Sequence, residues 1–216
     1  MTEQEIRKIV REVLEQGQTM DAPPPILVEA SARHVHLTAE AVEKLFGKGA
    51  KLTQKRPLSQ PGEFLSDQRV KLVTAKGEIA NVAVLGPERQ AVQVELSLTD
   101  ARVLGIKAPV NLSGDLSGAG DVYLVGEKGC LEAKSSVIAA KNHIHMTPED
   151  ARLYGVTQGQ RVRVRVDSSR PVTFEDVTVR VSPKFSLTMH IDFDEANACG
   201  LTPDAKGTLL PWKGGE

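Results

Sequence analysis

The stretch Arg161-Val162-Arg163-Val164-Arg165-Val166 alternates arginine and valine without interruption. Successive side chains of a β-strand point to opposite faces, so this alternation predicts a strand with one buried and one solvent-facing side. This part of the chain is therefore expected to be β-structure.

Several other segments of the chain have a similar character. The further strand candidates are residues 26–30, 70–73, 92–96, 121–125, 177–181 and 187–191. Turn signals separate them, among them Pro61-Gly62, Lys76-Gly77, Gly86-Pro87 and Ser182-Pro183. Short strands divided by such turns are typical of β-barrels and β-sandwiches.

Two segments about half a chain length apart match each other. Ala32-Arg33-His34-Val35-His36-Leu37-Thr38-Ala39-Glu40 parallels Lys141-Asn142-His143-Ile144-His145-Met146-Thr147-Pro148-Glu149. Residues 99–106, 149–156 and 194–201 share a second pattern, in which acidic residues open a short helical segment and a glycine closes it. The sequence thus predicts two related β-rich units, each with strands that lead into short helices.

Four of the five histidines form two His-x-His pairs, His34-Val35-His36 and His143-Ile144-His145, and the fifth is His190. On a strand, residues i and i+2 share a face and lie about 6.6 Å apart along the chain, so both imidazoles can bind one metal ion. On a helix they would point about 200° apart. Thr38 and Thr147 follow the pairs and suit helix N-caps, which puts each pair at the end of a strand. We interpret the pairs as metal ligands, although one such pair alone is often explained by core packing.

Other candidate residues are weaker on sequence alone. Glu95 alternates with apolar residues on a predicted strand and could be a further ligand or simply a solvated side chain. The Gly- and Ser-rich segment 112–120 could bind phosphate through its backbone N–H groups or be a flexible loop. Cys130 and Cys199 are interpreted as structural. No Gly-x-Ser-x-Gly motif supports an acyl-serine mechanism.

Composition limits the classes of partner. The chain has 216 residues and a formal net charge of -1, which gives no reason to expect a nucleic-acid partner. No apolar run approaches the ~20 residues of a membrane helix, and no secretory signal is recognisable. Two cysteines are too few for a disulfide framework and favour a reducing compartment.

The N-terminal segment differs from the rest. Residues 1–17 place apolar side chains at helical spacing and predict an amphipathic helix. Residues 18–25 form a linker that ends in Pro23-Pro24-Pro25, which is stiff and extended. We favour a docking or targeting segment, and the alternative is a helix that packs on its own domain or on a second subunit.

Five motifs together resemble a known family. They are Arg33-His34-Val35-His36-Leu37, Gln93-Val94-Glu95-Leu96-Ser97, Ser113-Gly114-Asp115, His143-Ile144-His145-Met146-Thr147 and His190-Ile191-Asp192. The combination resembles the PduL-type phosphate propanoyltransferases, the phosphotransacylases of bacterial microcompartments, over roughly residues 26–212.

This resemblance implies a mainly β fold of two related β-barrels with short capping α-helices. One barrel would comprise residues 26–33 and 141–212, and the other residues 34–140. It also implies two Zn²⁺ ions between the barrels. One zinc would be held by His34, His36 and Glu95, and the other by His143, His145 and His190.

The implied reaction is acyl-CoA + phosphate ⇌ acyl phosphate + CoA, with coenzyme A, acyl-CoA and phosphate as substrates and no acyl-enzyme. By the resemblance, Arg89 and Glu95 would be catalytic, and Arg89 and Ser113 would contact phosphate. Residues 1–17 would be an encapsulation peptide that binds microcompartment shell or cargo proteins, in a homo-oligomeric enzyme of the bacterial cytoplasm.

Three alternatives stay open at this point. The enzyme could prefer acetyl over propanoyl, since one methylene changes binding by only about 1–3 kcal/mol. A zinc-dependent acyl-CoA hydrolase could use the same ligands. A non-catalytic module could use zinc only to join its halves.

Overall fold

The computed structural model describes residues 23–211, and β-structure dominates them. The strands are β1 (Ile26–Ala30), β2 (His34–His36), β3 (Gln54–Pro57), β4 (Phe64–Val73), β5 (Glu78–Gly86), β6 (Gln93–Leu96), β7 (Val110–Asn111), β8 (Gly120–Val125), β9 (Cys130–Ala140), β10 (His143–Met146), β11 (Arg161–Asp167), β12 (Val172–Val181), β13 (Thr188–Ile191) and β14 (Lys206–Leu210). The helices are α2 (Ala39–Phe46), α3 (Leu98–Val103), α4 (Pro148–Leu153) and α5 (Phe193–Cys199). Residues 1–17, for which the sequence predicts a helix, lie outside the described residues.

One barrel combines the first strand with the C-terminal third of the chain. Its strands follow the closed order β1-β13-β10-β12-β11-β14. The alternating stretch forms β11, and its valines Val162, Val164 and Val166 are buried inside the barrel, as the pattern predicts. The ring closes because β1 pairs with β13 on one side and with β14 on the other.

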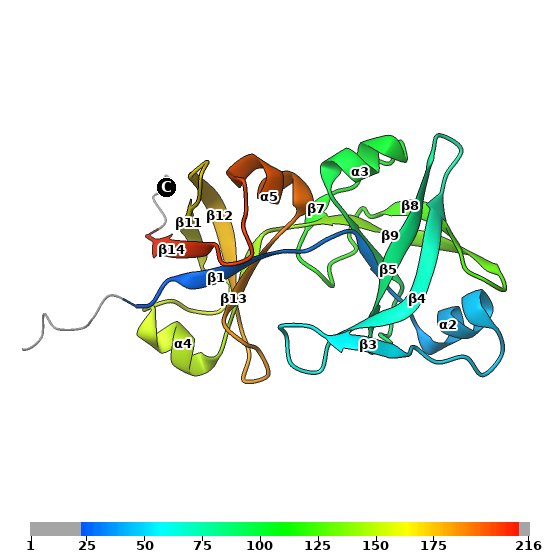
Figure 1. The fold of residues 1–216 in the computed structure, drawn as a ribbon, viewed down its shortest axis with the longest axis horizontal. Helices are drawn as coiled ribbons and strands as arrows, with labels where there is room; N and C mark the ends of the chain where they lie inside the picture. The colour runs from blue at the N-terminus through cyan, green and yellow to red at the C-terminus, as the bar shows by residue number, and fades with distance from the viewer. Residues whose placement is uncertain (1–22, 212–216) are drawn as a thin grey trace, which may run out of the picture.

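The central segment forms a second barrel of the same size. The pairings run β4-β5-β2-β6-β9 and then through β8 back to β4, while β3 and β7 add to the outside of this ring. Each barrel has its own buried apolar core. The prediction of two related β-barrels is therefore confirmed, and the barrels lie side by side (Figure 1).

Short helices follow strands in both barrels, as predicted. Thr38 caps α2 and Thr147 caps α4, each accepting a hydrogen bond from a backbone N–H three residues on. Gly105 and Gly155, which follow the caps of α3 and α4, share a φ of 64° that favours glycine. No helix in residues 23–211 is long and apolar enough to cross a membrane.

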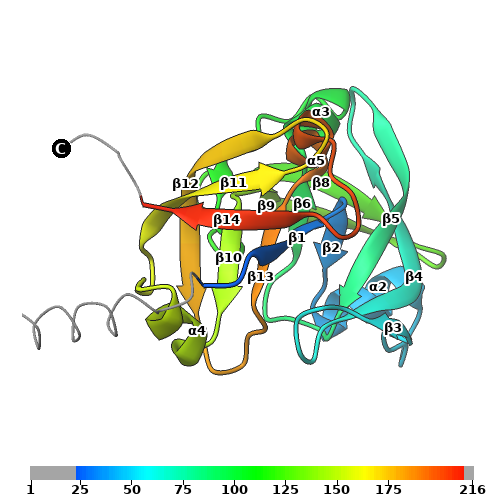
Figure 2. The ribbon, with the colours of Figure 1, turned by 60° about the vertical axis from the view of Figure 1, so that its left-hand side comes forward.

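The chain passes between the barrels at two points that position the histidines. The first crossing joins β1 to β2, and the second joins β9 to β10 (Figure 1; Figure 2). A His-x-His pair starts directly after each crossing, at His34 and at His143. Both pairs therefore lie at the junction of the barrels.

Candidate active site and metal centre

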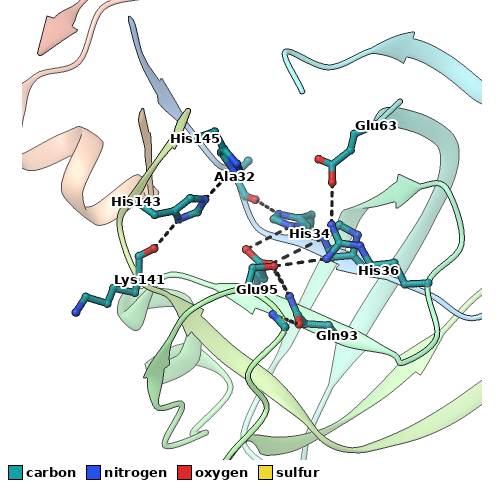
Figure 3. A network of polar contacts seen from close by, with 12 residues as sticks. Ala32, His34, His36, Glu63, Gln93, Glu95, Lys141, His143 and His145 are labelled. Atoms are coloured by element: carbon teal, nitrogen blue, oxygen red, sulfur yellow. Dashed lines mark hydrogen bonds and ion pairs between the residues drawn. The ribbon is translucent and has the colours of Figure 1, made fainter. Parts of the chain in front are cut away.

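The first histidine pair meets a carboxylate from the neighbouring strand. In the antiparallel pairing of β2 and β6, His34 lies opposite Glu95. The Nε2 atoms of His34 and His36 are 3.2 Å apart, and the Glu95 carboxylate oxygens lie 3.5 and 3.9 Å from them (Figure 3). All three side chains are buried. The structure thus brings together the three residues that were predicted as one ligand set.

The second pair meets a histidine in the same manner. His143 lies opposite His190 in the antiparallel pairing of β10 and β13, and its Nε2 is 3.0 Å from that of His145. The ligand atoms of the three histidines all lie within 4.8 Å of one another. The second predicted ligand set is therefore also assembled.

Backbone carbonyls at the two crossings orient one ring of each pair. Nδ1 of His34 is 2.7 Å from the carbonyl oxygen of Ala32, and Nδ1 of His143 is 2.8 Å from that of Lys141 (Figure 3). A carbonyl oxygen only accepts, so each Nδ1 carries a proton and each Nε2 points its lone pair at the partner ring. Such contacts commonly fix metal-binding histidines in proteins.

The electrostatic state differs between the two sets. Burial lowers the pKa of His143 to about 4 and holds that of His145 well below its usual range, so both rings are neutral near pH 7. Burial also lowers the pKa of His34, but the Glu95 carboxylate outweighs this effect and raises it overall. Burial opposes the ionisation of Glu95, yet His34 holds the pKa of this carboxyl far below its usual value. Without a metal ion, His34 therefore retains a second proton to higher pH than an ordinary histidine, and metal binding competes with this proton.

The donor set fits a divalent metal ion in both places. Tetrahedral zinc with Zn–N bonds of about 2.0–2.1 Å separates its ligand atoms by about 3.3 Å, close to the Nε2–Nε2 distances of 3.2 and 3.0 Å. Nε2 of His190, the third residue of the second set, is buried and makes no hydrogen bond within residues 23–211. Imidazole and carboxylate are ordinary zinc ligands, and three protein ligands leave a position free for substrate.

Both ligand sets line one cavity of about 1110 Å³ between the barrels. Arg89, Ser113, Arg180 and Phe185 line it as well. The cavity draws residues from both barrels, and both ligand sets face the same space.

Arg89 and Ser113 lie beside the first ligand set. The Arg89 guanidinium donates to Glu63 Oε1 at 2.9 Å and reaches Ser113 Oγ at 3.5 Å. The Ser113 hydroxyl in turn donates to Glu95 Oε1 at 2.7 Å. The structure thus joins both predicted phosphate-contacting residues to the carboxylate of the first set.

Gln93 was not predicted as a site residue but holds this network together. Its amide nitrogen donates to Glu95 Oε1 at 2.6 Å and to Ser113 Oγ at 2.9 Å, and its amide oxygen accepts from the N–H of Gly114. A sequence signal existed, because Gln93 precedes Glu95 by two positions on one strand and shares its face. Within segment 112–120, the Gly114 N–H is therefore already engaged by a side chain.

Glu63, Gln60 and Arg180 were also not predicted. Glu63 and Gln60 lie between β3 and β4, and the Gln60 amide exchanges two hydrogen bonds with the backbone of Ser186 across the junction. Nothing in the sequence distinguishes these residues from surface polar residues. Cys199 is buried, Cys130 is exposed, and neither belongs to the two ligand sets found among the described residues.

Comparison with known proteins finds one family, both in a family profile and among individual relatives. Residues 27–202 match the profile of the family described as phosphate propanoyltransferase. A phosphate propanoyltransferase of Leptotrichia buccalis is 48% identical over 210 residues, covering 97% of this chain and 99% of the relative. Another from Priestia megaterium is 50% identical over 210 residues, covering 97% of both chains, and one from Thermotoga maritima is 46% identical over 194 residues, covering 89% and 92%.

These matches define the class of protein as a transferase that exchanges CoA and phosphate on an acyl group. The chain belongs to the phosphate propanoyltransferase family.

Proposed function

We propose that the chain interconverts propanoyl-CoA and phosphate with propanoyl phosphate and CoA at a site that holds two zinc ions. His34, His36 and Glu95 would hold one ion. His143, His145 and His190 would hold the other. The observation that carries this proposal is the convergence of both sets on one cavity.

Bound zinc would supply Lewis acidity, which stabilises the CoA thiolate and polarises an oxygen of the second substrate. The protein holds the ligand atoms in position. Because its tautomer is fixed by a backbone carbonyl, each leading histidine presents Nε2 without a rotation or a tautomer change.

Arg89 is proposed to bind the phosphate. A guanidinium offers a planar fork of N–H donors that matches phosphate oxygens. The guanidinium of Arg89 lies at the cavity wall beside Ser113, which contacts Glu95. Its present partner Glu63 is about one-third exposed, with 35% of the side-chain surface accessible, so phosphate can replace this contact at modest cost. Ser113 and Gln93 keep the Glu95 carboxylate in place during the exchange.

The transfer is proposed to be direct. A phosphate oxygen attacks the thioester carbonyl carbon, the C–S bond breaks, and CoA leaves as its thiolate. No protein nucleophile is needed, and the described lining of the cavity contains neither cysteine. Holding both substrates in one cavity supplies much of the rate through proximity.

A single-turnover experiment tests the proposed function. Zinc-loaded protein is mixed with propanoyl-CoA carrying a radiolabelled acyl group, first without and then with phosphate, and quenched in acid. We expect labelled propanoyl phosphate only when phosphate is present, with no label on the protein and two zinc ions per chain by elemental analysis. Label retained on the protein would overturn direct transfer, and CoA release without phosphate would indicate a hydrolase.

The proposal extends to the N-terminal segment. Residues 1–17 carry the amphipathic pattern and precede a proline-rich linker, which together suit a peptide that binds microcompartment shell or cargo proteins. We expect deletion of residues 1–20 to leave kcat unchanged and to abolish co-sedimentation with assembled shells. The full-length chain is the control, and equal co-sedimentation of both proteins would contradict this role.

A further inference from the structure

Arg180 lies in the substrate cavity without a counter-ion. It is the penultimate residue of β12 and pairs in register with His145 of β10. Within residues 23–211 its guanidinium makes no hydrogen bond or ion pair, and its guanidinium carbon lies over the Phe185 ring, 5.7 Å from the ring centre. The side chain is half-buried and lines the cavity.

Other arginines of the same cavity differ from Arg180. Arg33 pairs with Asp100 at 3.1 Å, Arg89 pairs with Glu63, and Arg69 donates to two backbone carbonyls. Arg56 is exposed, so water satisfies it. Arg180 alone among these five combines partial burial with five N–H donors that lack a protein acceptor.

Partial burial of a charge without a partner is unfavourable, and a guanidinium cannot escape the cost by losing its proton. Burial lowers the pKa of Arg180, and Glu95 opposes this shift. Because the ordinary pKa of arginine is very high, the guanidinium keeps its charge. An anionic ligand that enters the cavity would supply the missing counter-charge. The unpaired guanidinium is therefore best explained by a negatively charged substrate.

We propose that Arg180 is a second phosphate-binding residue, which contacts the transferred phosphate from the first barrel while Arg89 contacts it from the second. This inference rests on phosphate being a substrate, and it does not depend on which metal ion is bound. The phosphates of CoA are the other possible anions. Their pantetheine arm separates them from the sulfur, whereas Arg180 lies beside His145 of the second ligand set.

Phe185 prepares Arg180 for this contact. Its ring packs edge to face against His145, with ring centres 4.3 Å apart, and lies under the Arg180 guanidinium. Stacking on an aromatic face restricts the guanidinium while leaving its edge donors free for oxygen atoms. The Arg180 side chain is thus already ordered before phosphate binds, so phosphate binding costs less conformational entropy.

The test compares Arg180→Met, which keeps an unbranched apolar side chain but removes the charge, with Arg180→Lys, which keeps the charge but not the planar fork. Arg165→Met is the matched control, because Arg165 lies on the same barrel, is exposed and, among the described residues, pairs with the exposed Asp167. We expect Arg180→Met to raise the KM for phosphate about tenfold or more and to change the KM for propanoyl-CoA less than twofold. Arg180→Lys should fall between Arg180→Met and the wild type, and Arg165→Met should match the wild type.

A binding measurement separates this role from the reaction itself. Equilibrium dialysis with radiolabelled inorganic phosphate should show the same loss of affinity in Arg180→Met, with unchanged metal content and thermal midpoint. An unchanged phosphate KM, or a raised KM for propanoyl-CoA alone, would overturn the assignment. If Arg180→Met does not fold, wild-type phosphate affinity in Arg180→Lys overturns it equally. Dialysis needs no turnover, so it decides on Arg180 even if the enzyme releases CoA without phosphate.

Discussion

Glu95→Gln is expected to remove one of two metal ions from the protein and to lower kcat by about 10³-fold. Glu95 supplies the only negative charge among the ligands of the first set and contacts both of its histidines. Glutamine has nearly the same volume and can keep part of the hydrogen bonding with Ser113, so the packing should survive. The loss is therefore a loss of charge at the metal, not of structure.

Elemental analysis and steady-state kinetics on the same preparation measure this effect. Glu132→Gln is the matched control, because Glu132 lies on the second barrel, is exposed and pairs with Lys134. We expect this control to retain two metal ions and wild-type rates. Two tightly bound ions and an unaltered kcat in Glu95→Gln would show that Glu95 is not a ligand.

The two ligand sets are copies of one arrangement with a single chemical difference. In each barrel a His-x-His strand follows a crossing and pairs antiparallel with a second strand that carries the third ligand. Glu95 lies opposite His34, and His190 lies opposite His143, so these third ligands occupy equivalent register positions. The helices after these second strands, α3 and α5, come from segments 99–106 and 194–201, which the sequence identifies as repeats.

This difference gives the two sets unequal charge. The first set contains the Glu95 carboxylate, which raises the pKa of the neighbouring His34 and is itself kept ionised by His34. The second contains three imidazoles and no anionic ligand. We therefore expect metal binding at the first set to weaken on acidification, because the proton on His34 competes with the metal ion. Binding at the second set requires its histidines to be neutral.

The sequence predicted those parts of the site that depend on local geometry. Alternation over residues 161–166 indicated a strand because strand side chains alternate by construction, and the spacing of each His-x-His pair indicated a shared face for the same reason. The strand pattern raised Glu95 as a possible ligand, and the resemblance predicted Glu95 and His190 as the third ligands. The pairing of distant strands brings both residues into register with the histidine pairs.

The remaining site residues depend on how the barrels approach each other. The segment Val179-Arg180-Val181 shows that Arg180 points away from its barrel core, but not whether that face meets solvent or a cavity. The contact between Gln60 and Ser186 joins residues 126 positions apart across the junction. No local pattern encodes such a distance, so the sequence alone did not identify these residues.

Arg89→Ala is expected to raise the KM for phosphate and to lower kcat/KM for phosphate by about a hundredfold, while leaving two metal ions in place. A charge-assisted hydrogen bond contributes about 1.5–3 kcal/mol, and the planar fork can make two such bonds to one phosphate. Arg89 contacts Glu63 and Ser113 but none of the histidine ligand atoms, so its removal should spare metal binding. Initial rates at varied phosphate and fixed propanoyl-CoA measure the effect.

Glu63→Gln is the matched variant for Arg89→Ala, and we do not expect it to raise the KM for phosphate as Arg89→Ala does. The Glu63 carboxylate forms an ion pair with the Arg89 guanidinium at 2.9 Å. Neutralising Glu63 weakens this pair and leaves the N–H donors of Arg89 free for phosphate. Phosphate KM in Glu63→Gln should therefore equal or fall below that of the wild type. If Arg89→Ala instead loses zinc and keeps its phosphate KM, Arg89 supports the Glu95 ligand through Ser113 and does not bind phosphate.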